Sequence, residues 1–135
     1  MGQKYLIDTC AVIKYLDNIF PPEAISFMDN LVDDDFKISF ITKIELLVWK
    51  PPVPSDILIR EEFLDGLEIH YINDDIISLA IQIRKATKIK LPDAVIAATA
   101  IANELVLLSD NDNDFNKVVP LGLKYMNPKT SFKAI

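Results

Sequence analysis

The sequence contains one cysteine and one histidine, which limits the chemistry available to it. A single cysteine, Cys10, excludes an internal disulfide. A single histidine, His70, argues against a zinc site, because zinc is held mainly by cysteine and histidine. Nothing around His70 indicates a Ser-His-Asp triad. A metal ion bound by this chain would therefore have oxygen ligands, which suit Mg²⁺ or Mn²⁺.

Long apolar runs are missing as well. No run approaches the roughly 20 residues that a membrane-spanning helix needs. Residues 1–5 lack the apolar stretch and the small-residue cleavage site of a signal peptide. We therefore expect a cytoplasmic protein that makes no use of a membrane.

Hydrophobic residues make up 50% of the 135 residues and charged residues 25%, which predicts a folded chain. The length suits a single domain over residues 1–135. The net charge of −6 by itself argues against nucleic acid, since phosphates usually meet a basic surface. Divalent cations between acidic side chains and phosphate would remove that objection. The charge alone therefore does not decide the function.

Apolar runs that suit buried strands alternate with segments of helical spacing. We predict strands over residues 5–7, 36–40, 67–72, 105–108 and 122–126. We predict helices over residues 11–16, from 21–23 onward, around 41–48, and over 54–66, 74–86 and 92–102, with the prolines of 51–54 joining two of them. This alternation indicates a mainly parallel sheet covered on both faces, with ligands bound at the carboxyl edge of the strands.

Acidic residues follow the strands or begin the helices at that edge: Asp8, Glu45, Asp93, Asp110, Asp112 and Asp114. Each has a structural explanation of its own. Asp8 suits a helix N-cap, and Asp93 is favoured by the dipole of the helix it begins. Glu45 fits a solvated stripe, and residues 110–114 fit a solvated turn. Their convergence on one edge is the argument for a site, because clustered carboxylates repel each other until a divalent cation joins them.

Three other acidic sites fit less well. Residues 110–114 resemble the start of an EF-hand loop, but Phe115 stands where that loop needs Gly and Leu121 where it needs Glu. A haloacid-dehalogenase-like phosphatase needs a second Asp two positions after Asp8, where this chain has Cys10. A response-regulator receiver has paired acids after its first strand, where this chain offers Asp8 alone.

Four segments together resemble a PIN domain, and specifically the short VapC-type toxins of toxin–antitoxin pairs. They are Leu-Ile-Asp-Thr at 6–9, Ile-Thr-Lys-Ile-Glu-Leu at 41–46, Leu-Pro-Asp-Ala-Val-Ile-Ala-Ala-Thr-Ala at 91–100, and Leu-Leu-Ser through Asp-Phe at 107–115. They occur in the family's order and span the chain nearly end to end. The resemblance implies an α/β, PIN-like (Rossmann-like) three-layer fold with a central, mainly parallel sheet flanked by helices.

The resemblance also implies a ribonuclease that uses Mg²⁺ or Mn²⁺, with catalytic and metal-binding residues at Asp8, Glu45, Asp93 and Asp114. Auxiliary positions in the same motifs are Thr9, Ser109, Asn111 and Asp112; Ser109 replaces the usual Thr, and Asn111 is placed to hold a metal-bound water. Two positions depart from the family, which commonly has Asn or Ser at Cys10 and often a basic residue at Asp110. The acid at 110 is expected to weaken a phosphate contact, and Asp110 or Asp112 could share the role of Asp114.

The implied partners are an RNA substrate, a small antitoxin whose C-terminal segment lies across the site, and a second copy of the chain in a homodimer. Arg84 is the preferred RNA contact in the basic stretch 84–90, because its planar guanidinium suits phosphate. Phe20, Phe27, Trp49 and Pro51 suit either partner contacts or the core. The alternative function is a catalytically inactive PIN-fold binding module that acts through protein or RNA contacts.

Overall fold

The strands of the computed structural model, which describes residues 3–48, 53 and 55–132, form one five-stranded sheet of order β3-β2-β1-β4-β5. All four pairs of neighbouring strands are parallel, which confirms the predicted α/β fold class. The strands are β1 (Tyr5–Ile7), β2 (Phe36–Ser39), β3 (Glu68–His70), β4 (Val106–Leu108) and β5 (Lys124–Met126).

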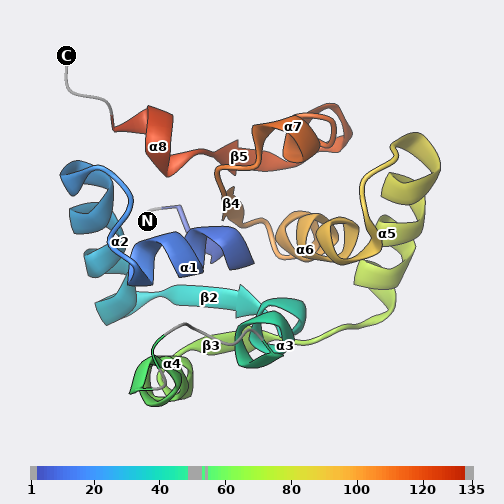
Figure 1. The fold of residues 1–135 in the computed structure, drawn as a ribbon. Coiled ribbons are helices and arrows are strands. Elements are labelled where there is room, and N and C mark those ends of the chain that lie inside the picture. Colours follow the sequence, from blue (N-terminus) through green and yellow to red (C-terminus); the bar gives the residue numbers. More distant parts are fainter. Residues whose placement is uncertain (1–2, 49–52, 54, 133–135) are drawn as a thin grey trace.

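Helices connect and cover these strands (Figure 1). The longer ones are α1 (Thr9–Leu16), α2 (Pro22–Asp34), α3 (Phe40–Val48), α4 (Ser55–Asp65), α5 (Asp74–Ala86) and α6 (Leu91–Ala102). The short ones are α7 (Asp112–Phe115), the 3-10 helix η1 (Val119–Leu121) and α8 (Pro128–Ser131), none of which the sequence pattern predicted. They are too short to show a helical period. Within the described ranges, no helix is both long and apolar enough to cross a membrane.

Two predicted strands are too long at their carboxyl ends. Residue 40 was expected in a strand, but Phe40 begins α3, because the Ser39 hydroxyl accepts a hydrogen bond from the backbone N–H of Ile41 (3.1 Å) and turns the chain into the helix. The third strand was expected to reach residue 72. It ends at His70, because its neighbour β2 ends at the paired Ser39 and no parallel partner extends further.

The last predicted strand is too long at its amino end. Gly122 closes η1 with a φ of 112°, in the left-handed region that glycine adopts at little cost. The strand therefore begins only at Lys124, where pairing with Val106 starts.

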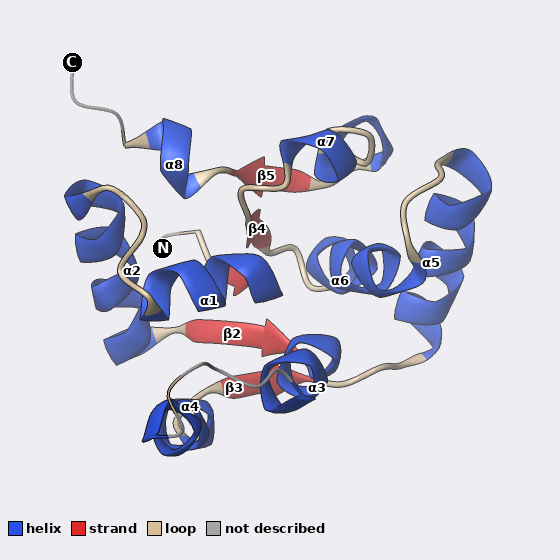
Figure 2. Cartoon of the chain, viewed as in Figure 1, coloured by secondary structure: helices blue, strands red, loops and turns tan. Residues whose placement is uncertain are grey.

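Helices lie on both sides of the sheet and form the expected three layers. Figures 1 and 2 show α1 and α2 to one side and α5 and α6 to the other. Alternate residues of β1 enter different cores: Leu6 packs with α5 and α6, and Ile7 packs with α1 and α2. The same alternation separates Leu107 from Leu108 in β4. Both strands are thus buried on their two faces, and the polar residues Asp8 and Ser109 follow directly after them.

Candidate active site

Asp8 lies directly after β1, at the carboxyl edge of the sheet. Its exposed fraction is 4%, and its Oδ2 accepts hydrogen bonds from Ser109 Oγ (2.8 Å) and Cys10 Sγ (2.9 Å). The pairing of Ile7 with Leu108 brings Ser109 beside it, although 101 positions separate the two. The side chain of Asp8 makes no capping hydrogen bond to α1, so the N-cap explanation does not account for it. Burial raises the pKa of Asp8, and the hydrogen bonds from Cys10 and Ser109 only partly oppose this.

Thr9 joins Glu45 to the start of α1. Its hydroxyl donates to Glu45 Oε1 (2.6 Å) and lies 3.0 Å from the hydroxyl of Thr42. Thr42 and Glu45 are three positions apart on α3, a spacing that places side chains on one helix face. The sequence analysis did not single out Thr42, but this spacing was a signal that pointed to it. Glu45 itself is exposed, so it sits at the edge of the site with access to solvent.

The pKa of Asp93, in the first turn of α6, indicates that the four predicted ligands form one electrostatic group. Its side chain is half-buried, and its pKa rises from 3.8 to about 6. The causes are burial first, then the negative charges of Asp8, Asp114 and Glu45, with Lys90 opposing them. Residues from four separate segments of the chain therefore act on one carboxylate.

Asn111 holds Asp114 in place. Its side-chain Nδ2 donates to Asp114 Oδ2 (3.0 Å), and its Oδ1 accepts from the Asp114 backbone N–H (3.4 Å) as the N-cap of α7. The expectation that Asn111 holds a metal-bound water is untested, and in this structure its amide orients Asp114.

Asp112 and Asp110 are engaged elsewhere. Asp112 Oδ1 accepts hydrogen bonds from the Tyr125 hydroxyl (2.5 Å) and Asn127 Nδ2 (3.0 Å), which direct it toward β5. Asp110 forms an ion pair with Lys14 of α1. Burial alone would raise the pKa of Asp110, but the hydrogen bond from Lys14, assisted by Cys10, lowers it. Asp114 is therefore the acid of this segment that faces Asp93.

Cys10 lies between Asp8 and Asp110. Its Sγ is 2.9 Å from Asp8 Oδ2, 3.2 Å from Asp110 Oδ1 and 3.4 Å from Ser109 Oγ. Burial, together with the charge of Asp8, raises the pKa of the thiol, so the sulfur keeps its proton and serves as a donor.

The donor chemistry of the four acids fits a divalent cation. Asp8, Glu45, Asp93 and Asp114 offer carboxylate oxygens, the ligands that Mg²⁺ and Mn²⁺ prefer. The negative charges of Asp8, Asp114 and Glu45, which add to burial in raising the pKa of Asp93, are what a cation would neutralise. Within residues 3–48, 53 and 55–132, no three acidic, histidine or cysteine side chains converge closely enough to enclose an ion.

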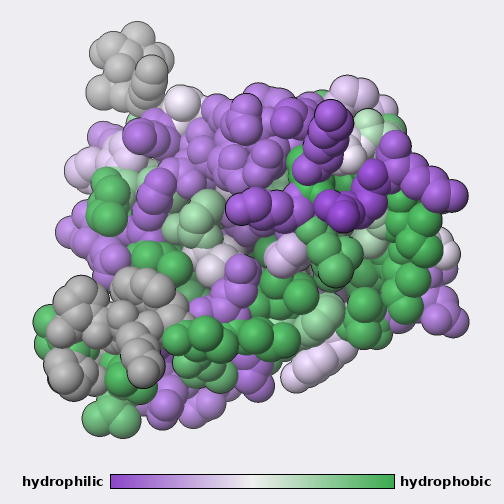
Figure 3. All heavy atoms as spheres, turned by 45° about the vertical axis from the view of Figure 1, so that its right-hand side comes forward, coloured by the Kyte–Doolittle hydropathy of each residue, from purple (hydrophilic) through white to green (hydrophobic). Residues whose placement is uncertain are grey.

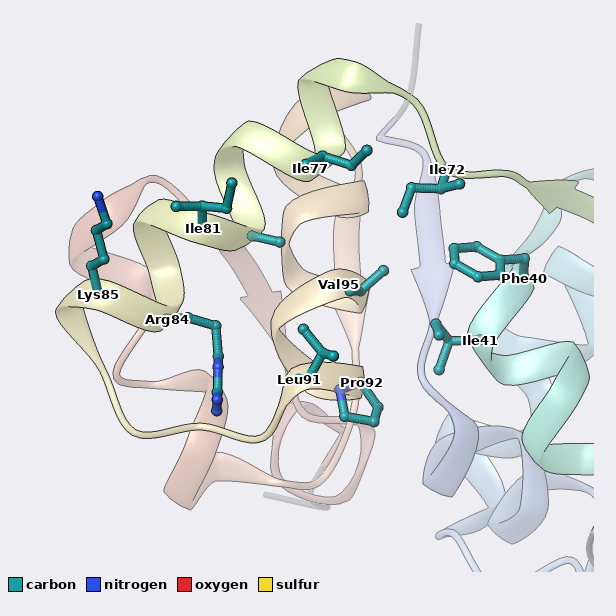
Figure 4. A pocket seen from close by; sticks show the side chains of 11 residues that line it. Phe40, Ile41, Ile72, Ile77, Ile81, Arg84, Lys85, Leu91, Pro92 and Val95 are labelled. Carbon is teal, nitrogen blue, oxygen red and sulfur yellow. The ribbon is translucent and has the colours of Figure 1, made fainter.

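Arg84, the expected RNA contact, lies at the rim of a hollow between α3, α5 and α6 (Figure 4). Its Nη1 donates to the backbone oxygen of Ile89 (2.7 Å). An RNA contact through Arg84 stays a prediction. Lys90, the residue just before α6, lowers the pKa of Asp93, and the sequence analysis had included it only as part of the basic stretch.

Of the aromatic residues considered for partner contacts, Phe20 is buried and Phe27 is half-buried. Phe27 packs on Tyr5 and Phe132, with ring centroids 5.3 and 5.0 Å apart. Both phenylalanines therefore belong to the core, whereas Trp49 and Pro51 lie outside the described residues.

Comparison with known proteins identifies the family. A model described as PIN domain matches residues 5–119. A comparison with curated proteins found no match. A DNA-bound VapBC from Salmonella typhimurium is 26% identical, with a TM-score of 0.76 over 94% of this chain and 99% of that chain. A toxin–antitoxin complex from Klebsiella pneumoniae is also 26% identical, with a TM-score of 0.73 over 93% and 98%.

VapBC2 from Rickettsia felis, bound to a DNA fragment from its promoter, shares the fold at 22% identity, with a TM-score of 0.76 over 93% of this chain and 98% of that chain. The family match spans most of the chain and includes Asp8, Glu45, Asp93 and Asp114. The chain belongs to the PIN domain family, and its fold is of the VapC type.

Proposed function

We propose that this protein is a metal-dependent endoribonuclease and the toxin of a toxin–antitoxin pair. The observation that carries the proposal is the electrostatic group around Asp93, in which acids from four separate segments act on each other at the carboxyl edge of the sheet. An acidic cluster of this kind suits cleavage of a phosphodiester with the help of Mg²⁺ or Mn²⁺. A bound divalent ion activates water and stabilises charge on the phosphate and the leaving oxygen.

The residues of the chain divide this work. Asp8 and Asp93 are the proposed principal metal ligands, and Glu45 and Asp114 complete the ligand set or orient waters. Thr9 holds Glu45 through a 2.6 Å hydrogen bond, and Asn111 holds Asp114. No histidine is needed. His70 lies in β3, where its Nε2 is 3.1 Å from Glu68 Oε2.

The apolar surface of α3 and α4 supports an antitoxin partner. Exposed apolar side chains on these helices are Ile44, Leu47, Val48, Ile57, Leu58 and Ile59. Ile44 is adjacent in sequence to Glu45, so a partner segment that buries this surface would lead directly to the acids. We propose that the antitoxin binds to this surface. We also propose that the protein is a soluble toxin of the cytoplasm.

A second apolar surface supports the homodimer. It is a hollow of about 630 Å³ lined mainly by apolar side chains, with Phe40 of α3 and Leu91 of α6 on opposite sides of it and Ile77 and Ile81 contributed by α5 (Figure 4). Figure 3 shows hydrophobic side chains gathered over this side of the molecule. We propose that a second copy of the chain covers it.

The alternative is a catalytically inactive PIN-fold binding module. The observation that favours it is the separation of the acids, no three of which enclose an ion in the described part of the chain. Metal-dependent cleavage, or its absence, separates the two functions.

The deciding experiment is cleavage of a mixed set of structured and single-stranded RNAs by purified, antitoxin-free protein. We expect cleavage with Mn²⁺ or Mg²⁺, and none with EDTA or in Asp8→Asn. Asp75→Asn is the matched control, because Asp75 is an exposed acid in the first turn of α5, outside the site. An absence of cleavage, together with an absence of metal binding by calorimetry, would favour the binding module.

A further inference from the structure

The two carboxylate oxygens of Asp8 differ in their surroundings. Both side-chain donors, Ser109 Oγ at 2.8 Å and Cys10 Sγ at 2.9 Å, meet Oδ2. Among the described residues, no side chain donates to Oδ1. A carboxylate held in this way presents one defined oxygen for a further contact.

The thiol of Cys10 has a second acceptor, Asp110 Oδ1, at 3.2 Å. A thiol has one proton, so the two carboxylates compete for it. The charge of Asp110 is already matched by its ion pair with Lys14. Among the described residues no cation pairs with Asp8, and Asp8 is more deeply buried than Asp110. The thiol proton is therefore donated to Asp8, where a hydrogen bond to an uncompensated carboxylate is stronger.

The geometry of α1 places Lys14 where it can neutralise Asp110 beside the thiol of Cys10. Cys10 and Lys14 are four positions apart on α1, so their side chains lie on the same helix face. Asp110 bridges them, since one of its oxygens faces Cys10 and the other faces Lys14. The sulfur is thus confined between Asp8 and a neutralised carboxylate.

We propose that Cys10 is a positioning residue, which together with Ser109 holds Oδ2 of Asp8 and so presents Oδ1 to the divalent cation. The Lys14–Asp110 pair keeps the thiol directed at Asp8. This inference rests on the proposed function, because it assigns a role at the same metal-binding site.

The test is the affinity of the full chain for Mn²⁺ alone, measured by titration calorimetry without RNA. Loss of a residue that orients a metal ligand typically weakens binding about 10- to 100-fold, and the thiol is a weak donor, so we expect roughly tenfold weaker binding in Cys10→Ala. Cys10→Ser keeps a donor at this position and should bind within about threefold of the unchanged protein. Ser78→Ala, which removes an exposed hydroxyl on α5, is the control.

Thermal unfolding in EDTA shows whether each variant is folded, and Cys10→Val replaces Cys10→Ala if the smaller side chain destabilises the protein. Equal Mn²⁺ affinity of folded Cys10→Ala and the unchanged protein would overturn the inference and leave the proposed function intact. So would a loss in Cys10→Ser as large as in Cys10→Ala. An unchanged protein that binds no Mn²⁺ would overturn the proposed function as well.

The role of Lys14 is tested by a double-mutant cycle. If Lys14 acts through Asp110 on the thiol, the loss of Mn²⁺ affinity caused by Cys10→Ala should be smaller when Lys14→Met is already present. An equal loss in both backgrounds would show that Lys14 and Cys10 act independently, and would overturn this part of the inference.

Discussion

Removing the charge of Asp93 should stabilise the metal-free protein. A pKa of about 6 in place of 3.8 corresponds to about 3 kcal/mol of unfavourable free energy for the ionised carboxylate in the folded state. This is an upper limit, because Asp93 is half-buried and water screens part of the repulsion. Asp93→Asn also loses the favourable interaction of the carboxylate with the N-terminus of α6, worth about 0.3–1 kcal/mol. We therefore expect a net gain of about 1–2 kcal/mol near neutral pH.

The pH dependence follows from the direction of the shift. The folded protein holds the proton of Asp93 more tightly than the unfolded chain, so stability falls as the pH rises from about 4 and stops falling above about pH 7. The gain in Asp93→Asn should be complete near pH 7.5 and less than half as large near pH 4.5.

Urea or thermal unfolding in EDTA at these two pH values measures the effect, which corresponds to a rise of roughly 3–8 °C in Tm near pH 7.5. Asp75→Asn is the matched control, since it removes an exposed acid from the first turn of α5 without relieving the repulsion in the site. The reasoning is refuted if Asp93→Asn is no more stable than the unchanged protein near pH 7.5, or if its gain is the same at both pH values.

Three further substitutions test other contacts. Thr9→Val removes the hydroxyl that holds Glu45 and should weaken Mn²⁺ binding about tenfold in calorimetry with little change in Tm; unchanged affinity would show that Glu45 needs no such support. Ser109→Ala leaves buried Asp8 without one of its two side-chain donors and should cost about 1–3 kcal/mol in urea unfolding; a neutral result would contradict the bonding described here. Ile81→Glu places a charge in the hollow between α3, α5 and α6 and should shift a dimer to monomer in light scattering, and a dimer that persists would exclude this surface as its interface.

Local patterns were sufficient to find the sheet edge and the acids on it. Asp8 follows an apolar run, and Asp93 lies in the first turn of a helix that is apolar on nearly every side. Both signals lie within a few residues of the side chain concerned, and parallel strands bring all such positions to one edge. The helix over 74–86 was predicted with its observed bounds, because its apolar residues recur at helical spacing and Asn73 caps its start.

Long-range contacts decided which acids face each other. Asp110 pairs with Lys14, which is 96 positions away in the chain. Asp112 accepts hydrogen bonds from Tyr125 and Asn127. Asp114 is the remaining acid, and its charge acts on Asp93. All three follow the same strand, and no local pattern distinguishes them.

The sequence by itself determined the order of the strands and the longer helices and the acids of the candidate site, because periodicity and residue chemistry are local properties. The tertiary structure alone decided the partners of each carboxylate. A hydrogen bond such as that from Ser109 to Asp8 exists only when two strands, distant in the chain, pair in one register.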